Sequence, residues 1–157
     1  MRHIISATVE NKPGVLARIV GIITGRGYNI ETLNVAPSLD PDISRLTMTT
    51  SGDDNVIEQV TKQLNKMVDV IKVSDLTVDA HLEGEYLFAK IATPRTKRAE
   101  IIEFLTLLKA ETLHITEKEI IVQFYGNAET IDKFFTLLKP YITDLSRSGP
   151  IAIAKDE

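Results

Sequence analysis

The strongest constraint on the fold is an order of helix-like and strand-like segments that occurs twice along the chain. Four segments have apolar residues at the three- and four-residue spacing of an amphipathic helix. They are Leu16, Ile19, Val20 and Ile23; Ile57, Val60, Leu64 and Met67; Ile101, Phe104, Leu105 and Leu108; and Ile131, Phe134, Phe135 and Leu138. Since each predicted helix has one apolar side, each is expected to pack on a sheet.

Strand-like stretches lie between these helices and complete two similar halves. In the first half, alternation and β-branched residues predict strands at residues 4–9, 29–37, 43–50 and 68–76. In the second half, weaker patterns predict strands at 86–92, 113–115, 120–125 and 142–145, the last of which either ends there or extends over 151–154. Asp40-Pro41-Asp42 is typical of a turn and predicts a hairpin. Each half is therefore a βαββαβ unit, so the fold class is α+β with two tandem ferredoxin-like domains.

The domain boundary is expected near residue 78. Residues 77–84 form a joint that ends in a glycine, which divides the chain into domains 1–78 and 79–157. With 43% apolar residues in 157, each half has enough apolar surface to form a small core.

Composition excludes several functions. The absence of cysteine excludes disulfides, iron–sulfur clusters and thiolate zinc sites. A net charge of −4 argues against nucleic acid as a partner. RNA-recognition domains share the βαββαβ order, but they stack bases on aromatic residues of their central strands, and strands 4–9 and 43–50 have none. No signal peptide or membrane-length apolar run occurs, so a cytoplasmic protein with no membrane partner is expected.

The sequence contains no set of residues typical of catalysis. His3, His81 and His114 are far apart and do not predict a metal site. Gly25-Arg26-Gly27 follows a predicted helix, so a left-handed helix cap is favoured over a phosphate loop. The basic cluster Pro94–Arg98 is either a solvated turn or a contact for an acidic partner. We therefore expect a protein that is not an enzyme.

The connection between the first predicted strand and helix has the features of a ligand site. Pro13 fixes a turn, and Gly14 allows a ligand to approach the backbone. The amides of Val15 and Leu16 open a helix, where free N–H groups favour a carboxylate. Asn11 can donate and accept hydrogen bonds, which suits an amino acid. A plain strand-to-helix turn, in which Asn11 serves local backbone groups, is an equally good interpretation.

Several motifs resemble a known family. Asn11-Lys12-Pro13-Gly14-Val15-Leu16 looks like the first loop of ACT domains, which are small-molecule sensors of amino-acid metabolism. The continuation is similar to the small regulatory subunit of acetohydroxyacid synthase, also called acetolactate synthase, at Arg26–Leu33, Val35–Pro37, Ser44–Thr47, Gln63–Val70 and Arg147–Gly149. The resemblance is strong over about the first 76 residues, whereas the second half agrees in length and layout.

The resemblance implies a regulatory subunit that is not itself catalytic. It would bind and activate the catalytic subunit of acetohydroxyacid synthase, and it would confer feedback inhibition by valine in branched-chain amino acid biosynthesis. This chain would hold no cofactor, because thiamine diphosphate, Mg and FAD are expected in the catalytic partner. The alternative is a free-standing ACT sensor that controls another enzyme or a transcription regulator.

The resemblance also implies where the effector binds. The ACT domains would form a homodimer, with valine, or else leucine or isoleucine, held between the two chains. One chain would contribute Asn11, Gly14, Val15 and Leu16, and the other Asn29 and Ile30, with Ala36 nearby on the same strand. The apolar side chains of Val15, Leu16 and Ile30 could line a cavity for a branched side chain.

Overall fold

The computed structural model describes residues 1–156 and forms two compact units. The first unit comprises residues 1–83 together with the chain from residue 149 onward, and the second comprises residues 84–148. The division falls within strands β5 (His81–Ala92) and β8 (Ile142–Ala154). The domain limits expected from sequence, 1–78 and 79–157, place the last residues in the second half, whereas their contacts are with the first unit.

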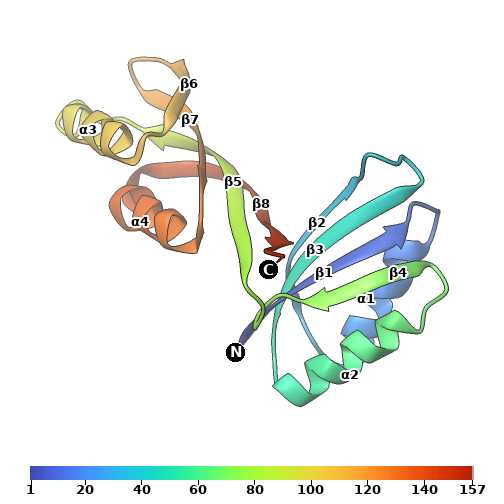
Figure 1. Ribbon diagram of the computed structural model, residues 1–157. Coiled ribbons are helices and arrows are strands. Elements are labelled where there is room, and N and C mark those ends of the chain that lie inside the picture. The colour runs from blue at the N-terminus through green and yellow to red at the C-terminus, as the bar shows by residue number, and fades with distance from the viewer. Residues whose placement is uncertain (157) are drawn as a thin grey trace. The chain divides into compact units, whose positions relative to one another are not determined.

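The first unit is a four-stranded antiparallel sheet with two helices on one face (Figure 1). Its elements are β1 (Arg2–Glu10), α1 (Val15–Gly25), β2 (Ile30–Pro37), β3 (Ile43–Ser51), α2 (Asp54–Asn65) and β4 (Val70–Asp75). The strand order β2-β3-β1-β4 makes β2 and β4 the edge strands. The predicted βαββαβ order of this half is confirmed.

The core of the first unit lies between the sheet and the two helices. Alternate residues of β1 point to the helices, and the buried residues of α1 and α2 recur at three- and four-residue spacing. These residues include Ile5, Ala7, Val9, Val15, Ile19, Ile23, Ile57, Val60 and Leu64. The apolar face of α1 is therefore centred on Val15, Ile19 and Ile23, and Leu16, which the sequence pattern included, lies beside it with 40% of its surface exposed.

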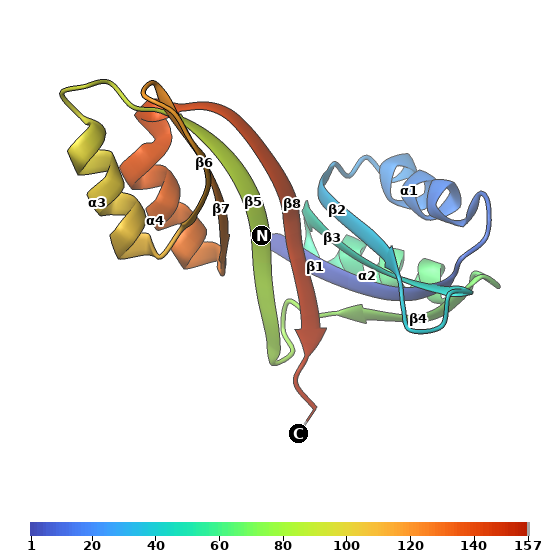
Figure 2. The same cartoon turned by 90° about the horizontal axis from the view of Figure 1, so that it is seen from above.

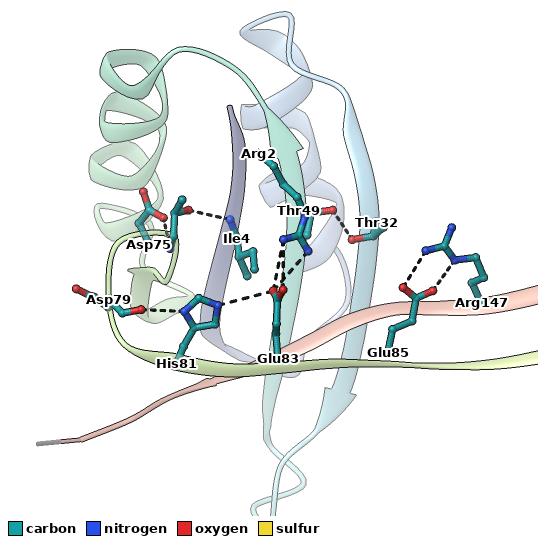
Figure 3. Close-up of polar contacts among 11 residues, drawn as sticks. Arg2, Ile4, Thr32, Thr49, Asp75, Asp79, His81, Glu83, Glu85 and Arg147 are labelled. Carbon is teal, nitrogen blue, oxygen red and sulfur yellow. Dashed lines mark hydrogen bonds and ion pairs between the residues drawn. The ribbon is translucent and has the colours of Figure 1, made fainter. Parts of the chain in front are cut away.

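The other face of the first sheet is partly covered by the end of the chain. Ala152 packs with Ile4 and Leu76 in a small apolar cluster, and the amide of Lys155 donates to the carbonyl of Ala80 at 2.8 Å. Figure 3 shows this last strand on the side of the sheet away from α1 and α2. The face of the sheet that carries no helix, called the open face below, is therefore partly covered.

The second unit has the same topology. Its elements are the continuation of β5, α3 (Arg98–Leu108), β6 (Glu111–Ile115), β7 (Glu119–Gly126), α4 (Ala128–Leu138), a short 3-10 helix (Lys139–Tyr141) and β8. The strand order β6-β7-β5-β8 matches that of the first sheet, and α3 and α4 cover one face (Figure 2). No helix of the 156 described residues is long and apolar enough to cross a membrane.

One expectation about strand limits in the second half was wrong. Residues 81–84 were assigned to a joint, but they form the start of β5. Gly84 does not break the strand, because the ring of Tyr125 occupies the space that a side chain at residue 84 would fill. For the last strand the extended alternative is confirmed, because β8 is continuous from Ile142 to Ala154, through the Gly149-Pro150 pair.

Candidate functional site

The loop between β1 and α1 presents free backbone amides at the start of the helix. Gly14 precedes the first helical residue with φ of 84°, a left-handed conformation that favours glycine. The amide of Arg18 donates to the carbonyl of Gly14 at 3.1 Å, and the amide of Val15 makes a long contact of 3.4 Å to the carbonyl of Lys12. The amides of Leu16 and Ala17 have no acceptor within residues 1–156. Together they can receive an anion.

The two cations beside this loop, Lys12 and Arg18, are already paired. The ammonium of Lys12 lies 2.9 Å from a carboxylate oxygen of Glu10, and this hydrogen bond raises the pKa of Lys12. The guanidinium of Arg18 pairs with the carboxylate of Asp69. The first turn of α1 contains no acidic residue. Attraction for an anion therefore comes from the backbone amides and the helix dipole.

Asn11 combines the two interpretations made from sequence. Its side-chain nitrogen donates to the carbonyl of Pro41 at 2.9 Å, and its backbone amide donates to the carbonyl of Asp42 at 2.7 Å. Asn11 therefore attaches the loop to the β2–β3 turn, as the local interpretation expected. Its side-chain oxygen accepts no hydrogen bond from the described part of the chain, so it can still accept one from an ammonium group.

The two apolar residues of the loop differ in what they can contact. The side chain of Val15 is buried in the core of the first unit, so it supports the loop from below. The side chain of Leu16 is exposed and is available to an apolar ligand or a second chain.

The expected residues of β2 lie far from this loop within one chain. Both segments can be located by their partners on β3. Glu10, which leads into the loop, pairs with Ile43 at one end of β3, and Ile30 pairs with Thr50 at the other end. The eight residues of β2 span about 23 Å. Asn29, whose carbonyl accepts from Thr50 Oγ1 at 2.7 Å, and the half-buried Ile30 are therefore at the opposite end of the sheet from the loop.

Ala36 lies on the other face of β2 from Ile30. The register shifts between Ile30 and Thr32, so the alternation of faces does not continue from one end of β2 to the other. Ala36 pairs with Arg45 on the open face, whereas Ile30 faces the helices. Leu33 and Val35, which sequence reasoning missed, pair with core residues of β3 and are 36% and 40% exposed. The alternation of these two apolar residues with polar ones along the strand was the sequence signal that could have identified them.

The remaining candidates have structural roles. Gly27 has φ of 80° and its amide donates to the carbonyl of Thr24 at 3.0 Å, so the predicted helix cap is confirmed. Arg98 donates to Thr93 Oγ1 and to the carbonyls of Thr116 and Glu117 at 2.8–3.0 Å. Lys97 pairs with Glu100. Residues 1–156 contain no group of three or more histidine, aspartate or glutamate side chains that could hold a metal.

Comparisons with known proteins cover both halves of the chain. A family described as the ACT domain of AHAS small subunit-like proteins matches residues 5–72, and a family described as the small subunit of acetolactate synthase matches residues 84–156. A probable acetolactate synthase small subunit from Methanothermobacter thermautotrophicus is 43% identical over 98% of this chain and 92% of its own length.

Two further relatives agree with these matches. The acetolactate synthase isozyme 3 small subunit of Escherichia coli is 37% identical over all of this chain and 98% of its own. The crystal structure of the acetolactate synthase small subunit from Thermotoga maritima superposes with a TM-score of 0.88, at 28% identity over 100% of this chain and 99% of the other. The order of elements, the ACT-type loop and these matches along the full length show that the chain belongs to the acetolactate synthase small-subunit family.

Proposed function

We propose that this chain is a regulatory, non-catalytic subunit that binds the catalytic subunit of acetolactate synthase, raises its activity and makes it sensitive to valine. The family membership supports this proposal, since relatives over the full length are named small subunits of that enzyme. Thiamine diphosphate, Mg and FAD would belong to the catalytic partner, and the complex would act in the cytoplasm.

The observation that carries the proposal is the separation of the two halves of the effector site. The loop and the Asn29–Ile30 end of β2 lie at opposite ends of one strand. Within residues 1–156, no strand pairs with the outer edge of β2. If the β2 strands of two copies pair antiparallel about a twofold axis, the Ile30 end of each lies beside the loop of the other. A homodimer would therefore complete two equivalent sites.

The chemistry of this shared site suits a branched-chain amino acid. The amides of Leu16 and Ala17 would receive the α-carboxylate. The side-chain oxygen of Asn11 would accept a hydrogen bond from the ammonium group. The exposed side chain of Leu16, with Ile30 of the second copy, would contact the aliphatic group. Valine, leucine and isoleucine all have this combination of groups, and valine is the proposed effector.

Regulation follows from the sharing of the ligand. An effector that contacts two chains binds only the assembled dimer and so stabilises it. Inhibition then requires that the effector favour one state of the complex with the catalytic subunit over another, and such couplings amount to about 1–3 kcal/mol.

The test is reconstitution with the catalytic subunit. Acetolactate formation is measured with and without this chain, and with added valine, leucine or isoleucine. We expect stimulation by the chain and inhibition that is strongest with valine. A catalytic subunit whose rate is unchanged by this chain, with or without effector, would overturn the proposal, and valine binding alone would then indicate a sensor of another enzyme.

A further inference from the structure

The open face of the first sheet contains a polar hollow of about 230 Å³, on the side away from α1 and α2. Its floor comes from three adjacent strands, with Ser6 and Thr8 on β1, Arg45 on β3, and Lys72 and Ser74 on β4. One wall is the end of the chain, including Asp156. All these residues belong to the first unit.

The strand register places two cations on either side of one hydroxyl. Thr8 pairs with Arg45 on β3 and with Lys72 on β4. Directly opposite residues have Cβ atoms about 4.5–5.5 Å apart, so both long side chains can reach a point above Thr8. In the next row, Ser6 pairs with Ser74. The hollow therefore has two positive charges above a floor of hydroxyl groups.

These two cations differ from most others in the first unit because neither is neutralised. Lys12 and Arg18 each pair with a carboxylate, whereas Arg45 and Lys72 form no ion pair within residues 1–156. Arg45 Nε donates to Ser6 Oγ at 3.2 Å, which orients the guanidinium and leaves its terminal nitrogens available. Because the buried Ser6 hydroxyl accepts that bond, its own hydrogen can still be donated.

From this geometry we propose that the hollow binds the phosphate group of a small molecule. The polar groups of its floor can all act as donors, and a phosphate dianion offers only acceptors. Its charge matches the one guanidinium and one ammonium, and the planar guanidinium can bind two of its oxygens. The volume suits inorganic phosphate or the head of a phosphomonoester, and these two sources share the recognised group. This site is separate from the proposed effector site and does not depend on it.

Removing the charge of Asp156 should change phosphate affinity in the opposite direction from removing either cation. Its carboxylate lines the same hollow and repels a bound anion. Asp156→Asn should therefore strengthen phosphate binding several-fold, whereas Arg45→Gln and Lys72→Gln should each weaken it about tenfold or more, because each removes a charged hydrogen-bond donor. Arg95→Gln and Lys118→Gln remove exposed cations of the second unit and serve as matched controls.

The experiment is calorimetric titration of the full chain at constant ionic strength with inorganic phosphate, glycerol 3-phosphate and acetate. We expect saturable binding of both phosphates, weaker binding of acetate, and the pattern of variants given above, with folding of each variant checked by circular dichroism. Absence of saturable phosphate binding, equal loss in the control variants, or acetate binding as tight as phosphate would each overturn the proposal. Binding of inorganic phosphate but not glycerol 3-phosphate would support the site and identify the free ion as its ligand.

Discussion

Gly14 links backbone conformation to the proposed anion contact. Its φ of 84° disfavours most side chains, but aspartate and asparagine adopt this conformation more readily than others. A side chain built there would make only an ordinary contact, with Arg18. Gly14→Asp therefore adds a negative charge beside the amides of Leu16 and Ala17 at a modest cost in strain. We expect it to raise the valine concentration for half-inhibition more than tenfold and to retain activation of the catalytic subunit.

The neutral variant Gly14→Asn is the control for shape. It has nearly the same size and backbone preference as aspartate, so it should lose much less valine sensitivity. Inhibition of the reconstituted enzyme across a valine titration measures both variants. Equal sensitivity of Gly14→Asp and the unmodified protein would rule out the loop as the carboxylate site.

Gly149 is a second residue with a left-handed backbone, and it contributes to stability. Its φ is 72°, and a Cβ there would lie 2.8 Å from the Cβ of Thr32 on β2. Gly149→Ala should therefore lower the free energy of unfolding of the first unit by about 2 kcal/mol. Gly21→Ala is the matched control, because Gly21 lies within α1 and a Cβ there would have no described atom within 4 Å apart from the backbone of its own helix. It should raise stability by about 0.5–1 kcal/mol. Urea unfolding distinguishes the two, and a neutral Gly149→Ala would contradict the expected clash.

At the scale of elements, helices were predicted more accurately than strands. Helices α3 and α4 each contain all four apolar residues expected from their periodicity, because that spacing places one apolar side against the sheet. For strands, the start of β5 was missed because Gly84 resembles a break, although it accommodates the ring of Tyr125. A register shift in β2, which has no signature in the residues themselves, places Ala36 and Ile30 on opposite faces of the strand.

Pairing between β5 and β8 is reinforced by one ion pair in the second unit. Arg147 Nε and Nη2 contact the two carboxylate oxygens of Glu85 at 2.5 and 2.9 Å, as Figure 3 shows, and the guanidinium stacks over Phe135 at 5.0 Å. Glu85 is only 6% exposed. The hydrogen bond to Glu85 raises the pKa of Arg147, so the guanidinium stays charged in this pair.

Loss of Arg147 would leave a buried carboxylate without its partner. We expect Arg147→Met to destabilise the second unit by about 2 kcal/mol, less than for a fully buried pair because the guanidinium is about half exposed. Glu85→Gln combined with Arg147→Met should recover part of this loss, since no charge then remains buried. Amide exchange of β7 reports on this unit alone. Arg2→Met removes the more exposed pair with Glu83 in the first unit and should leave the amide exchange of β7 unchanged.

At the scale of the whole molecule, the chain has two units of one topology. The motifs that indicate the family are strong in the first unit and weak in the second. The functional motifs fall in the first unit, yet the end of the chain returns to that unit and supplies a wall of the polar hollow. No sequence pattern predicts this return, because the apolar run Ile151–Ala154 is too short to indicate which sheet it packs against. The dimer was expected from the family resemblance, and the exposed edge of β2 provides a physical reason for it.

The dimer and the two proposed ligands can be separated with one variant. Leu33→Asp combined with Val35→Asp places charges on the exposed apolar side chains of the edge strand, and we expect it to be monomeric in sedimentation measurements. Because the proposed effector site needs two chains, valine should raise the melting temperature of the unmodified protein but not of this variant. Phosphate should raise the melting temperature of both, since the hollow lies within one first unit.

A matched control is Leu107→Asp, which adds a charge at an exposed leucine of α3 and should preserve the dimer and both ligand responses. The outcomes then separate the two sites. A monomeric variant that still responds to valine would contradict the shared effector site and leave the phosphate site intact. A monomeric variant that loses the phosphate response together with the valine response would contradict a phosphate site formed by the sheet of a single chain.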